Sequence, residues 1–418
     1  MDSFEIVDGG GITTPKGFRA TGVHAGFRKN PGRLDFALVV ADERAKTTGV
    51  FTQNTFCAAP VIFCKDVLKS DEDDKACGVK DIKVIAINSG CANAATGESG
   101  LKVANKSAKI VANALGCDSS EVLVSSTGVI GVQLPIEPFY EGTNLGIQRL
   151  SKNGGKDAAK AIMTTDTKHK EIAVKIDGAS LGLEGDFFIG GMVKGSGMIQ
   201  PNMATMIAVV TTDVPLTDRA IKQSFRAAVN KSFNCVTVDS DTSTNDSAFF
   251  MCSSKESDKS IDINTCAFEE FLSALKFVCI ELAKKIAQDG EGASRVVQVT
   301  VEGAKDDFQA DAAAREVANS PLVKTAIAGH DANWGRVAAA LGKSKAEFRQ
   351  EDVDIDFLGI PVLRAGLPID FDEDEASERF KDLQVNIDCK LGDGNGRAVI
   401  WTCDLTHDYV SINADYRS

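Results

Sequence analysis

A loop near the middle of the chain has the residue types needed to present a nucleophile. It runs Lys194-Gly-Ser-Gly-Met-Ile-Gln-Pro-Asn-Met-Ala-Thr205-Met206 in a chain of 418 residues. The glycines and the proline predict turns, and the apolar residues 207–210 that follow predict a buried strand. Thr205 would then stand at the mouth of a core strand, where its hydroxyl could attack an acyl group. On the local pattern alone, an ordinary turn with a threonine at a strand start is the simpler interpretation.

The histidines argue against a histidine base for that hydroxyl. The chain has only four, which are His24, His169, His330 and His407. None lies in a His-Glu-x-x-His motif, and no Gly-x-Ser-x-Gly elbow accompanies them. If the chain transfers acyl groups, we expect its general base to be another group.

Composition favours small-molecule chemistry or protein assembly. The net charge is −13, with 43% hydrophobic and 25% charged residues, which is ordinary for a globular protein. Such a surface repels nucleic acid and anionic lipid, so we expect neither as a partner. No apolar run approaches the roughly 20 residues of a membrane span, and the N-terminus has no signal-peptide pattern. We expect a cytoplasmic protein, or a mitochondrial matrix protein if a presequence has been removed.

The eleven cysteines predict reduced thiols and no metal centre. Their number is odd, they form no Cys-x-x-Cys pair, and several, such as Cys64 and Cys279, lie in apolar runs. No zinc-ligand spacing is present. Asp239, Asp241 and Asp246 could suggest a cation loop, but the glycine and distal glutamate of an EF-hand are missing. We interpret these aspartates as part of a hydrogen-bonded structural turn near the site.

Two segments of small residues follow predicted strands in the first half of the chain. The strand at 83–88 ends in Asn88-Ser-Gly-Cys-Ala-Asn-Ala-Ala-Thr-Gly97, and a helix is expected at 99–115. A second strand begins at Glu121 and ends in Ser125-Ser-Thr127-Gly128-Val-Ile-Gly131. Small residues allow a backbone or a ligand to approach closely. Either segment could line a site, and an ordinary turn is the alternative for both.

Strand and helix patterns alternate along the rest of the chain. Strands are expected at 34–41, 48–52, 171–176, 180–183, 187–190, 206–212, 235–238, 247–252, 296–301, 353–357, 383–387, 398–405 and 409–413. Helices are expected at 138–153, 156–164, 219–231, 268–288, 307–319 and 334–341. The order is not strictly βαβ, and many strands look antiparallel. The expected fold class is therefore α/β, or α+β layers, with sheets sandwiched between helices.

Together these stretches resemble the ornithine acetyltransferase family, the glutamate N-acetyltransferases of arginine biosynthesis. The matching segments occur in family order from Asn88 to the last residue. They are 88–97, Ser126-Thr-Gly-Val-Ile-Gly131, Ile162-Met-Thr-Thr-Asp-Thr167, 194–206, 238–246, Asp289-Gly-Glu-Gly-Ala293, Asp331-Ala-Asn-Trp-Gly-Arg336 and Tyr409-Val-Ser-Ile-Asn-Ala-Asp-Tyr-Arg-Ser418. The resemblance implies the N-terminal-nucleophile fold that this family shares with certain aminopeptidases.

The resemblance also implies that the chain cuts itself between Ala204 and Thr205. Residues 1–204 would become an α chain and 205–418 a β chain, and the two would pack as one catalytic unit. Cutting gives Thr205 a free α-amine with a reference pKa of about 7.7–8.0, against about 10.4 for lysine. That amine could act as the general base that the histidines do not supply.

Further roles are implied residue by residue. Thr127 and Gly128 would form an oxyanion hole through a hydroxyl and a backbone N–H. Thr164, Lys194, Thr205, Glu291, Asn413 and Ser418 would contact substrate. The choice between Thr164 and the adjacent Thr165 stays open. The family commonly ends in threonine, whereas this chain ends in Ser418, which keeps the hydroxyl.

The predicted reaction is acetyl transfer from N-acetyl-L-ornithine to L-glutamate through an acetyl-Thr205 intermediate. No cofactor is expected, although acetyl-CoA could serve as a second acetyl donor. The α and β chains are expected to pair, in a heterotetramer or larger assembly. Two alternatives stay open: an N-terminal-nucleophile amidase or aminopeptidase, and an uncleaved binding protein without catalysis.

Overall fold

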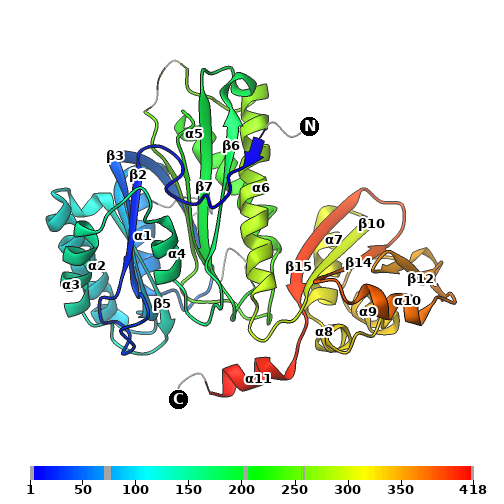
Figure 1. Cartoon of the computed structure of the whole chain (residues 1–418). Helices are drawn as coiled ribbons and strands as arrows, with labels where there is room; N and C mark the ends of the chain where they lie inside the picture. Colours follow the sequence, from blue (N-terminus) through cyan, green and yellow to red (C-terminus); the bar gives the residue numbers. More distant parts are fainter. Residues whose placement is uncertain (1–3, 70–76, 201–205, 256, 258, 416–418) are drawn as a thin grey trace. The chain divides into compact units, whose positions relative to one another are not determined.

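The computed structural model describes residues 4–69, 77–200, 206–255, 257 and 259–415. These residues form two compact units. Unit 1 comprises the described parts of Met1–Gly195, Pro201–Asn234 and Thr242–Leu282, and unit 2 comprises those of Ser196–Gln200, Cys235–Asp241 and Ala283–Ser418. Each unit has a sheet of its own (Figure 1). Ala204, Thr205 and Ser418 lie outside the described residues.

Unit 1 is built on a mixed sheet that carries the two strands on either side of the predicted nucleophile. Its strands are β1 (Phe4–Ile6), β2 (Phe18–Val23), β3 (Phe36–Phe51), β4 (Lys80–Cys91), β5 (Val122–Val129), β6 (Lys170–Asp177), β7 (Asp186–Lys194), β8 (Ile207–Thr212) and β9 (Ser247–Cys252). They run in the order β1-β6-β7-β8-β9-β3-β4-β5, with β2 also paired to β3. Lys194 of β7 pairs with Ile207 of β8. The chain therefore leaves the sheet before the predicted cut and returns beside its point of departure.

Helices pack closely on this sheet where glycines allow it. They are α1 (Ala59–Leu68), α2 (Gly97–Leu115), α3 (Glu137–Gln148), α4 (Gly155–Ala161), α5 (Asp218–Asn230) and the first part of α6 (Cys266–Gln288). A Cβ on Gly191 would come within 2.7 Å of Leu282 in α6, and a Cβ on Gly22 would come within 2.0 Å of the Asp157 carbonyl in α4. Every residue of β8 is buried, as expected for a continuous apolar run.

Unit 2 contains a smaller sheet with helices on one face. Its strands are β10 (Val296–Ala304), β11 (Asp354–Phe357), β12 (Ile360–Arg364), β13 (Leu367–Pro368), β14 (Gln384–Lys390) and β15 (Gly396–Cys403), in the order β13-β12-β11-β14-β10-β15. Its helices are α7 (Asp307–Asn319), α8 (Pro321–Ala328), α9 (Trp334–Gly342), α10 (Glu373–Arg379) and α11 (His407–Ala414). Alternate residues of β10, Val297, Val299 and Val301, share a core with α7.

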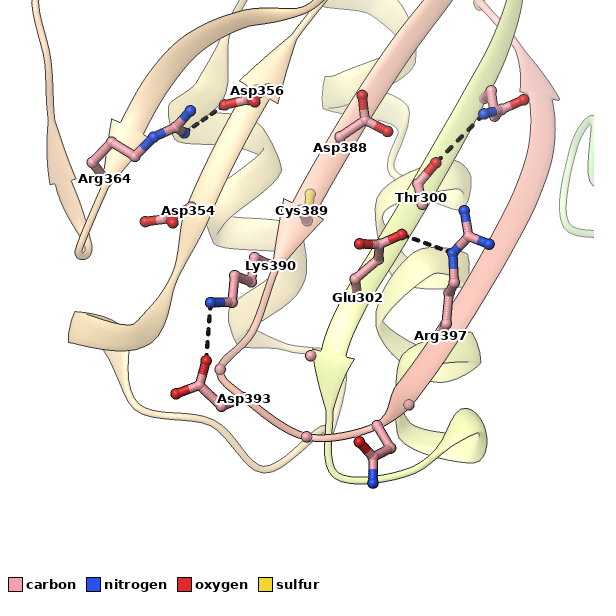
Figure 2. Close-up of a pocket in the computed structure, with 16 residues that line it drawn as sticks. Thr300, Glu302, Asp354, Asp356, Arg364, Asp388, Cys389, Lys390, Asp393 and Arg397 are labelled. Carbon is pink, nitrogen blue, oxygen red and sulfur yellow. Dashed lines mark hydrogen bonds and ion pairs between the residues drawn. The ribbon is translucent and has the colours of Figure 1, made fainter.

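The opposite face of that sheet forms a polar groove of about 1010 Å³ (Figure 2). Ion pairs such as Glu302 with Arg397 and Lys390 with Asp393 line it. None of the predicted site residues lies among its lining residues. The groove therefore does not coincide with the chemistry predicted from the sequence.

The predicted mixed α/β class is confirmed, and two elements agree to the residue. The helix expected at 307–319 is α7, and the strand expected at 247–252 is β9. None of the described helices is both long and apolar enough to cross a membrane.

Three of the predicted strands are wrong. Residues 409–413 lie in helix α11, because Thr406 accepts a hydrogen bond from the Asp408 amide and caps it. Residues 180–183 overlap a 3-10 turn, which Asp177 caps. Within the described part of the chain, residues 235–238 contain a single bridge, from Val236 to Trp401, and the Val238 amide bonds instead to the Ile199 carbonyl.

Candidate active site

The predicted oxyanion turn lies where two parallel strands end side by side. β4 and β5 are in register with Ser89 opposite Thr127 and Gly90 opposite Gly128. Gly128 has a φ of 134°, and a Cβ on it would lie 2.3 Å from the Gly90 carbonyl carbon. Only glycine fits this close approach of two backbones. Thr127 itself is largely buried, with 9% of its surface exposed.

Two buried asparagines brace the turn. Asn88 accepts a hydrogen bond from the Ser126 hydroxyl at 2.6 Å and donates to the Cys91 carbonyl at 3.0 Å. Asn245 donates from its side-chain amide to the carbonyls of Ser126 and Ala92. These bonds give the buried backbone carbonyl groups hydrogen-bond donors in place of the water from which burial removes them. These bonds fix Ser126, which precedes Thr127, and the neighbouring backbone at Cys91 and Ala92.

Asp246, the next residue after Asn245, holds the chain just beyond the predicted nucleophile. Its carboxyl group accepts a hydrogen bond from the Met206 backbone amide, and the Ser247 amide donates to the Met206 carbonyl at 3.0 Å. Asn245 and Asp246 therefore connect the oxyanion turn to the residue that follows Thr205. Burial raises the pKa of Asp246 well above its ordinary value, although the Lys194 ammonium acts in the opposite direction. Within the described part of the chain, Asp246 Oδ2 has no hydrogen-bond partner.

A second buried carboxylate, Asp166, organises the predicted substrate residues of unit 1. It pairs with the Lys170 ammonium at 2.6 Å, and both side chains are almost fully buried. Its oxygens also accept the Thr164 amide at 2.9 Å and the Gly195 amide at 2.7 Å. Gly195 follows Lys194 directly, so one carboxylate ties the Thr164 loop to the end of β7.

The charges around Asp166 keep it ionised. Burial alone would raise its pKa, but the ammonium groups of Lys170 and Lys194 outweigh burial and hold that pKa well below the ordinary range. Lys194 is itself buried, with 6% of its surface exposed. Its charge interacts with both Asp166 and Asp246. An ammonium group held in this way could bind a substrate carboxylate, as predicted.

In unit 2, Glu291 and Asn413 meet. Asn413 of α11 donates from Nδ2 to Glu291 Oε2 at 2.8 Å. Glu291 is 7% exposed, and its amide donates to the Ser196 carbonyl at 2.9 Å. A Cβ on Gly197 would lie only 2.3 Å from the Glu291 carboxyl carbon. The segment before the predicted cut therefore packs its backbone against this carboxylate.

The predicted residues thus fall into two groups, each assembled within its own unit. Unit 1 holds Thr127 and Gly128 at one strand end, and it joins Thr164 to Lys194 through Asp166. Unit 2 joins Glu291 to Asn413. The roles of Ala204, Thr205 and Ser418 stay predictions, since these residues lie outside the described ones. Within the described residues, no group of three or more His, Cys, Asp or Glu side chains could hold a metal ion.

The carboxylates that position these residues are not among the site residues predicted from the sequence. Asp166 lies in the family segment Ile162-Met-Thr-Thr-Asp-Thr167, in which the resemblance assigns substrate contact only to Thr164 or Thr165. The sequence predicts that Asp239 belongs to a hydrogen-bonded structural turn, and the structure shows that its carboxylate accepts hydrogen bonds from the amides of Met198 and Ile199. In both cases the sequence shows a charged residue inside a motif, but it does not show which backbone amides that residue contacts.

Comparison with known proteins gives a family. The sequence model of the ArgJ family matches residues 19–418. The chain belongs to the ArgJ family. It is 43% identical to the arginine biosynthesis bifunctional protein ArgJ of Dehalococcoides mccartyi over 99% of both chains. The family predicted from the motifs is therefore confirmed.

Two solved structures are also similar to this ArgJ-family chain. One is an ArgJ protein from Bacillus halodurans, 41% identical, with 50% of this chain and 98% of that chain covered and a TM-score of 0.47. The other is ornithine acetyltransferase from Mycobacterium tuberculosis complexed with ornithine. It is 34% identical, with 48% of this chain and 100% of that chain covered and a TM-score of 0.41.

Proposed function

We propose that this ArgJ-family chain is a self-cleaving acetyltransferase that moves acetyl from N-acetyl-L-ornithine to L-glutamate. The observation that carries the proposal is membership of the family across both sides of Ala204–Thr205. Relatives named as arginine biosynthesis proteins, and one named as an ornithine acetyltransferase with bound ornithine, support the substrate class.

Self-cleavage would begin with attack by the Thr205 hydroxyl oxygen on the Ala204 carbonyl carbon. The new C–O bond replaces the C–N bond, and the hydroxyl proton passes to the released nitrogen. Water then hydrolyses the ester, which leaves a carboxylate on Ala204 and a free amine on Thr205. A planar peptide resists this attack, so the surrounding loop must favour it.

The acetyl transfer would use the same oxygen twice. Thr205 attacks the acetyl carbonyl of N-acetyl-L-ornithine while its α-amine takes the hydroxyl proton, and ornithine leaves as the amine. The amine of L-glutamate then attacks the acetyl ester and restores the Thr205 hydroxyl. Thr127 and Gly128 would stabilise the oxyanion of both steps, a contribution of roughly 3 kcal/mol per donor.

The remaining predicted residues would select the substrates. Lys194 would pair with a substrate carboxylate, and Glu291 with a substrate ammonium. Thr164, Asn413 and Ser418 would add hydrogen bonds. The mature α and β chains would act as one unit, in a heterotetramer or larger assembly. Acetyl-CoA is proposed as an additional donor.

Intact mass and a denaturing gel test the cleavage. The purified chain should give two bands, each about half of 44.3 kDa. Thr205→Ala should give one full-length band and no acetyl transfer. Thr205→Ser keeps the hydroxyl and should still be cut. Omitting glutamate tests the transfer: continued release of ornithine at the full rate would show a hydrolase instead.

A further inference from the structure

The segment that leads into the predicted cut, Ser196–Gln200, is anchored to unit 2 near both of its ends. The Ser196 hydroxyl donates to the Asp289 carbonyl at 2.6 Å. The Gln200 side-chain oxygen accepts a hydrogen bond from Asn319 Nδ2 at 2.6 Å. These contacts leave little freedom in the backbone between them.

Asp239 holds the middle of this segment with both oxygens of one carboxylate. The Met198 amide donates to Oδ2 at 2.6 Å, and the Ile199 amide donates to Oδ1 at 2.8 Å. The neighbouring Val238 amide returns a bond to the Ile199 carbonyl at 2.6 Å. Charge-assisted bonds of this kind are shorter and stronger than neutral ones. Two consecutive peptide units are therefore fixed by a single side chain.

The bonded backbone has an unusual conformation. Met198 has a φ of 55°, in the left-handed region that residues other than glycine seldom adopt. Its side chain is 41% exposed, so side-chain packing does not account for the conformation. Such residues persist where the surrounding contacts over-determine them. Here the contacts are those of Asp239 with the amides on either side of the Met198 carbonyl.

We propose that Asp239 is a positioning residue for self-cleavage at Ala204–Thr205. The inference rests on the cleavage set out under the proposed function. Within unit 2, Asp239 and Asn319 fix the backbone up to Gln200, shortly before Ala204. Restricting the backbone that leads into the reacting bond lowers the conformational entropy lost on reaching the attack geometry.

Asp239→Asn tests the role with little change in volume. The carboxamide keeps one acceptor oxygen, but its NH2 group would face a backbone N–H. We expect newly made chain to be cleaved roughly tenfold or more slowly than the unmodified chain. The rate is measured from the intact mass of samples taken over time. Asp372→Asn is the matched control, because Asp372 also accepts two consecutive amides, those of Asp374 and Glu375, at the start of α10. The control chain should be cut at the normal rate.

Substitutions at Met198 test the backbone conformation without removing a polar group. Glycine adopts a positive φ readily, whereas a β-branched residue does not. Met198→Gly should therefore be cut at close to the normal rate, and Met198→Val should be slowed by roughly tenfold. Equal rates for the two variants would overturn the role of this conformation. The pair also decides the matter if Asp239→Asn fails to fold.

Hydroxylamine locates the affected step. It cleaves an ester directly, so it accelerates a chain that forms the ester and is slow only in hydrolysis. The positioning role requires that hydroxylamine does not restore the rate of Asp239→Asn. The inference would be overturned if hydroxylamine fully restored the cleavage rate of Asp239→Asn. It would also be overturned if Asp239→Asn, without hydroxylamine, were cleaved at a rate within twofold of the unmodified chain. If the unmodified chain stays intact, or Thr205→Ala is also cut, the proposed function fails instead.

Discussion

The Asp166 carboxylate accepts the backbone amide of Gly195 at 2.7 Å, across 29 positions of sequence. The same side chain is paired with Lys170 in a buried ion pair. Removing the carboxylate would leave the buried Lys170 ammonium without its opposite charge, which costs about 3–5 kcal/mol. Asp166→Ala should therefore lower the free energy of unfolding by that order, measured by urea unfolding in the uncleavable Thr205→Ala chain.

A double variant separates stability from substrate binding at this site. Adding Lys170→Met removes the buried positive charge that has lost its carboxylate, and it should recover most of the lost stability. Asp166→Ala should also raise KM in the cleaved chain, because the amides of Gly195 and Thr164 lose their acceptor. The double variant restores no such acceptor, so its KM should stay raised. Recovery of both stability and KM would show that Asp166 serves only as the partner of Lys170.

Gly128→Ala should disable the predicted oxyanion turn. The added methyl would meet the Gly90 backbone at 2.3 Å, and the φ of 134° is unfavourable for alanine. We expect kcat to fall by at least about 100-fold, the size expected for loss of an oxyanion donor.

Gly131→Ala is the matched control for that change. Gly131 also has a positive φ, of 79°, but a Cβ there would meet nothing within 4 Å. Its variant should lose about 1–2 kcal/mol of stability and keep most of its kcat. Similar kcat losses in the two variants would mean that the close approach to Gly90 is not what matters.

The strands around the Thr127–Gly128 turn could be predicted from the sequence, but the side chains that hydrogen-bond to them could not. The strand leading to Thr127 and the apolar run after Thr205 were recognisable because burial on both faces requires continuous apolar residues. The bond from Asn245 to Ser126 joins residues 119 positions apart. No local pattern encodes such a pairing, so a polar residue in a motif could be singled out without its role.

Short segments were the least predictable. Residues 409–413 alternate in polarity like a strand, yet they form α11, where the local cap at Thr406 decides the conformation. Helix α8 is not among the predicted helices, although it begins at Pro321 with Ser320 as its cap, a start signal that the sequence contains. Asp239 and Met198 could not be linked either, since their contact depends on the return of the chain through unit 2.

Asp246→Asn should change the pH dependence of stability. The pKa of Asp246 is raised in the folded chain, whereas an unfolded aspartate titrates near about 3.9. Between those two pKa values the folded state holds a proton that the unfolded state has lost. Raising the pH therefore destabilises the folded chain, by up to about 1.4 kcal/mol per pH unit. Asparagine has no proton to lose, so the stability of the variant relative to the parent should increase from about pH 4 upward.

Asp262→Asn provides a control of opposite sign for the same urea titration. Hydrogen bonds from Arg219 and Thr217 lower the pKa of Asp262 to about 2. Its contribution to stability is present above the unfolded pKa and is lost as the pH falls through about 2. The asparagine variant should therefore be the less stable chain near neutral pH and equal to its parent in strong acid. Parallel pH curves for both variants would contradict the assignment of Asp246.

Glu291→Gln should weaken binding of substrates that carry an ammonium group. The side chain keeps its size, and its oxygen can still accept the 2.8 Å bond from Asn413. What is lost is the negative charge, and hydrogen bonds to charged groups are worth about 1.5–3 kcal/mol. KM for N-acetyl-L-ornithine should therefore rise by about tenfold or more, while Tm should stay close to that of the parent chain.

Asn413→Ala provides an intermediate variant for the effect on KM, because it removes the hydrogen-bond donor to Glu291 but leaves the Glu291 charge in place. Its KM should rise by less than that of Glu291→Gln. Glu302→Gln removes a carboxylate in the same unit that pairs with Arg397 on the polar groove, and it should leave KM unchanged. If KM for Glu291→Gln equals that of the parent, Glu291 is not one of the substrate contacts. If KM rises more for Asn413→Ala than for Glu291→Gln, the substrate contact belongs to Asn413 of α11 instead.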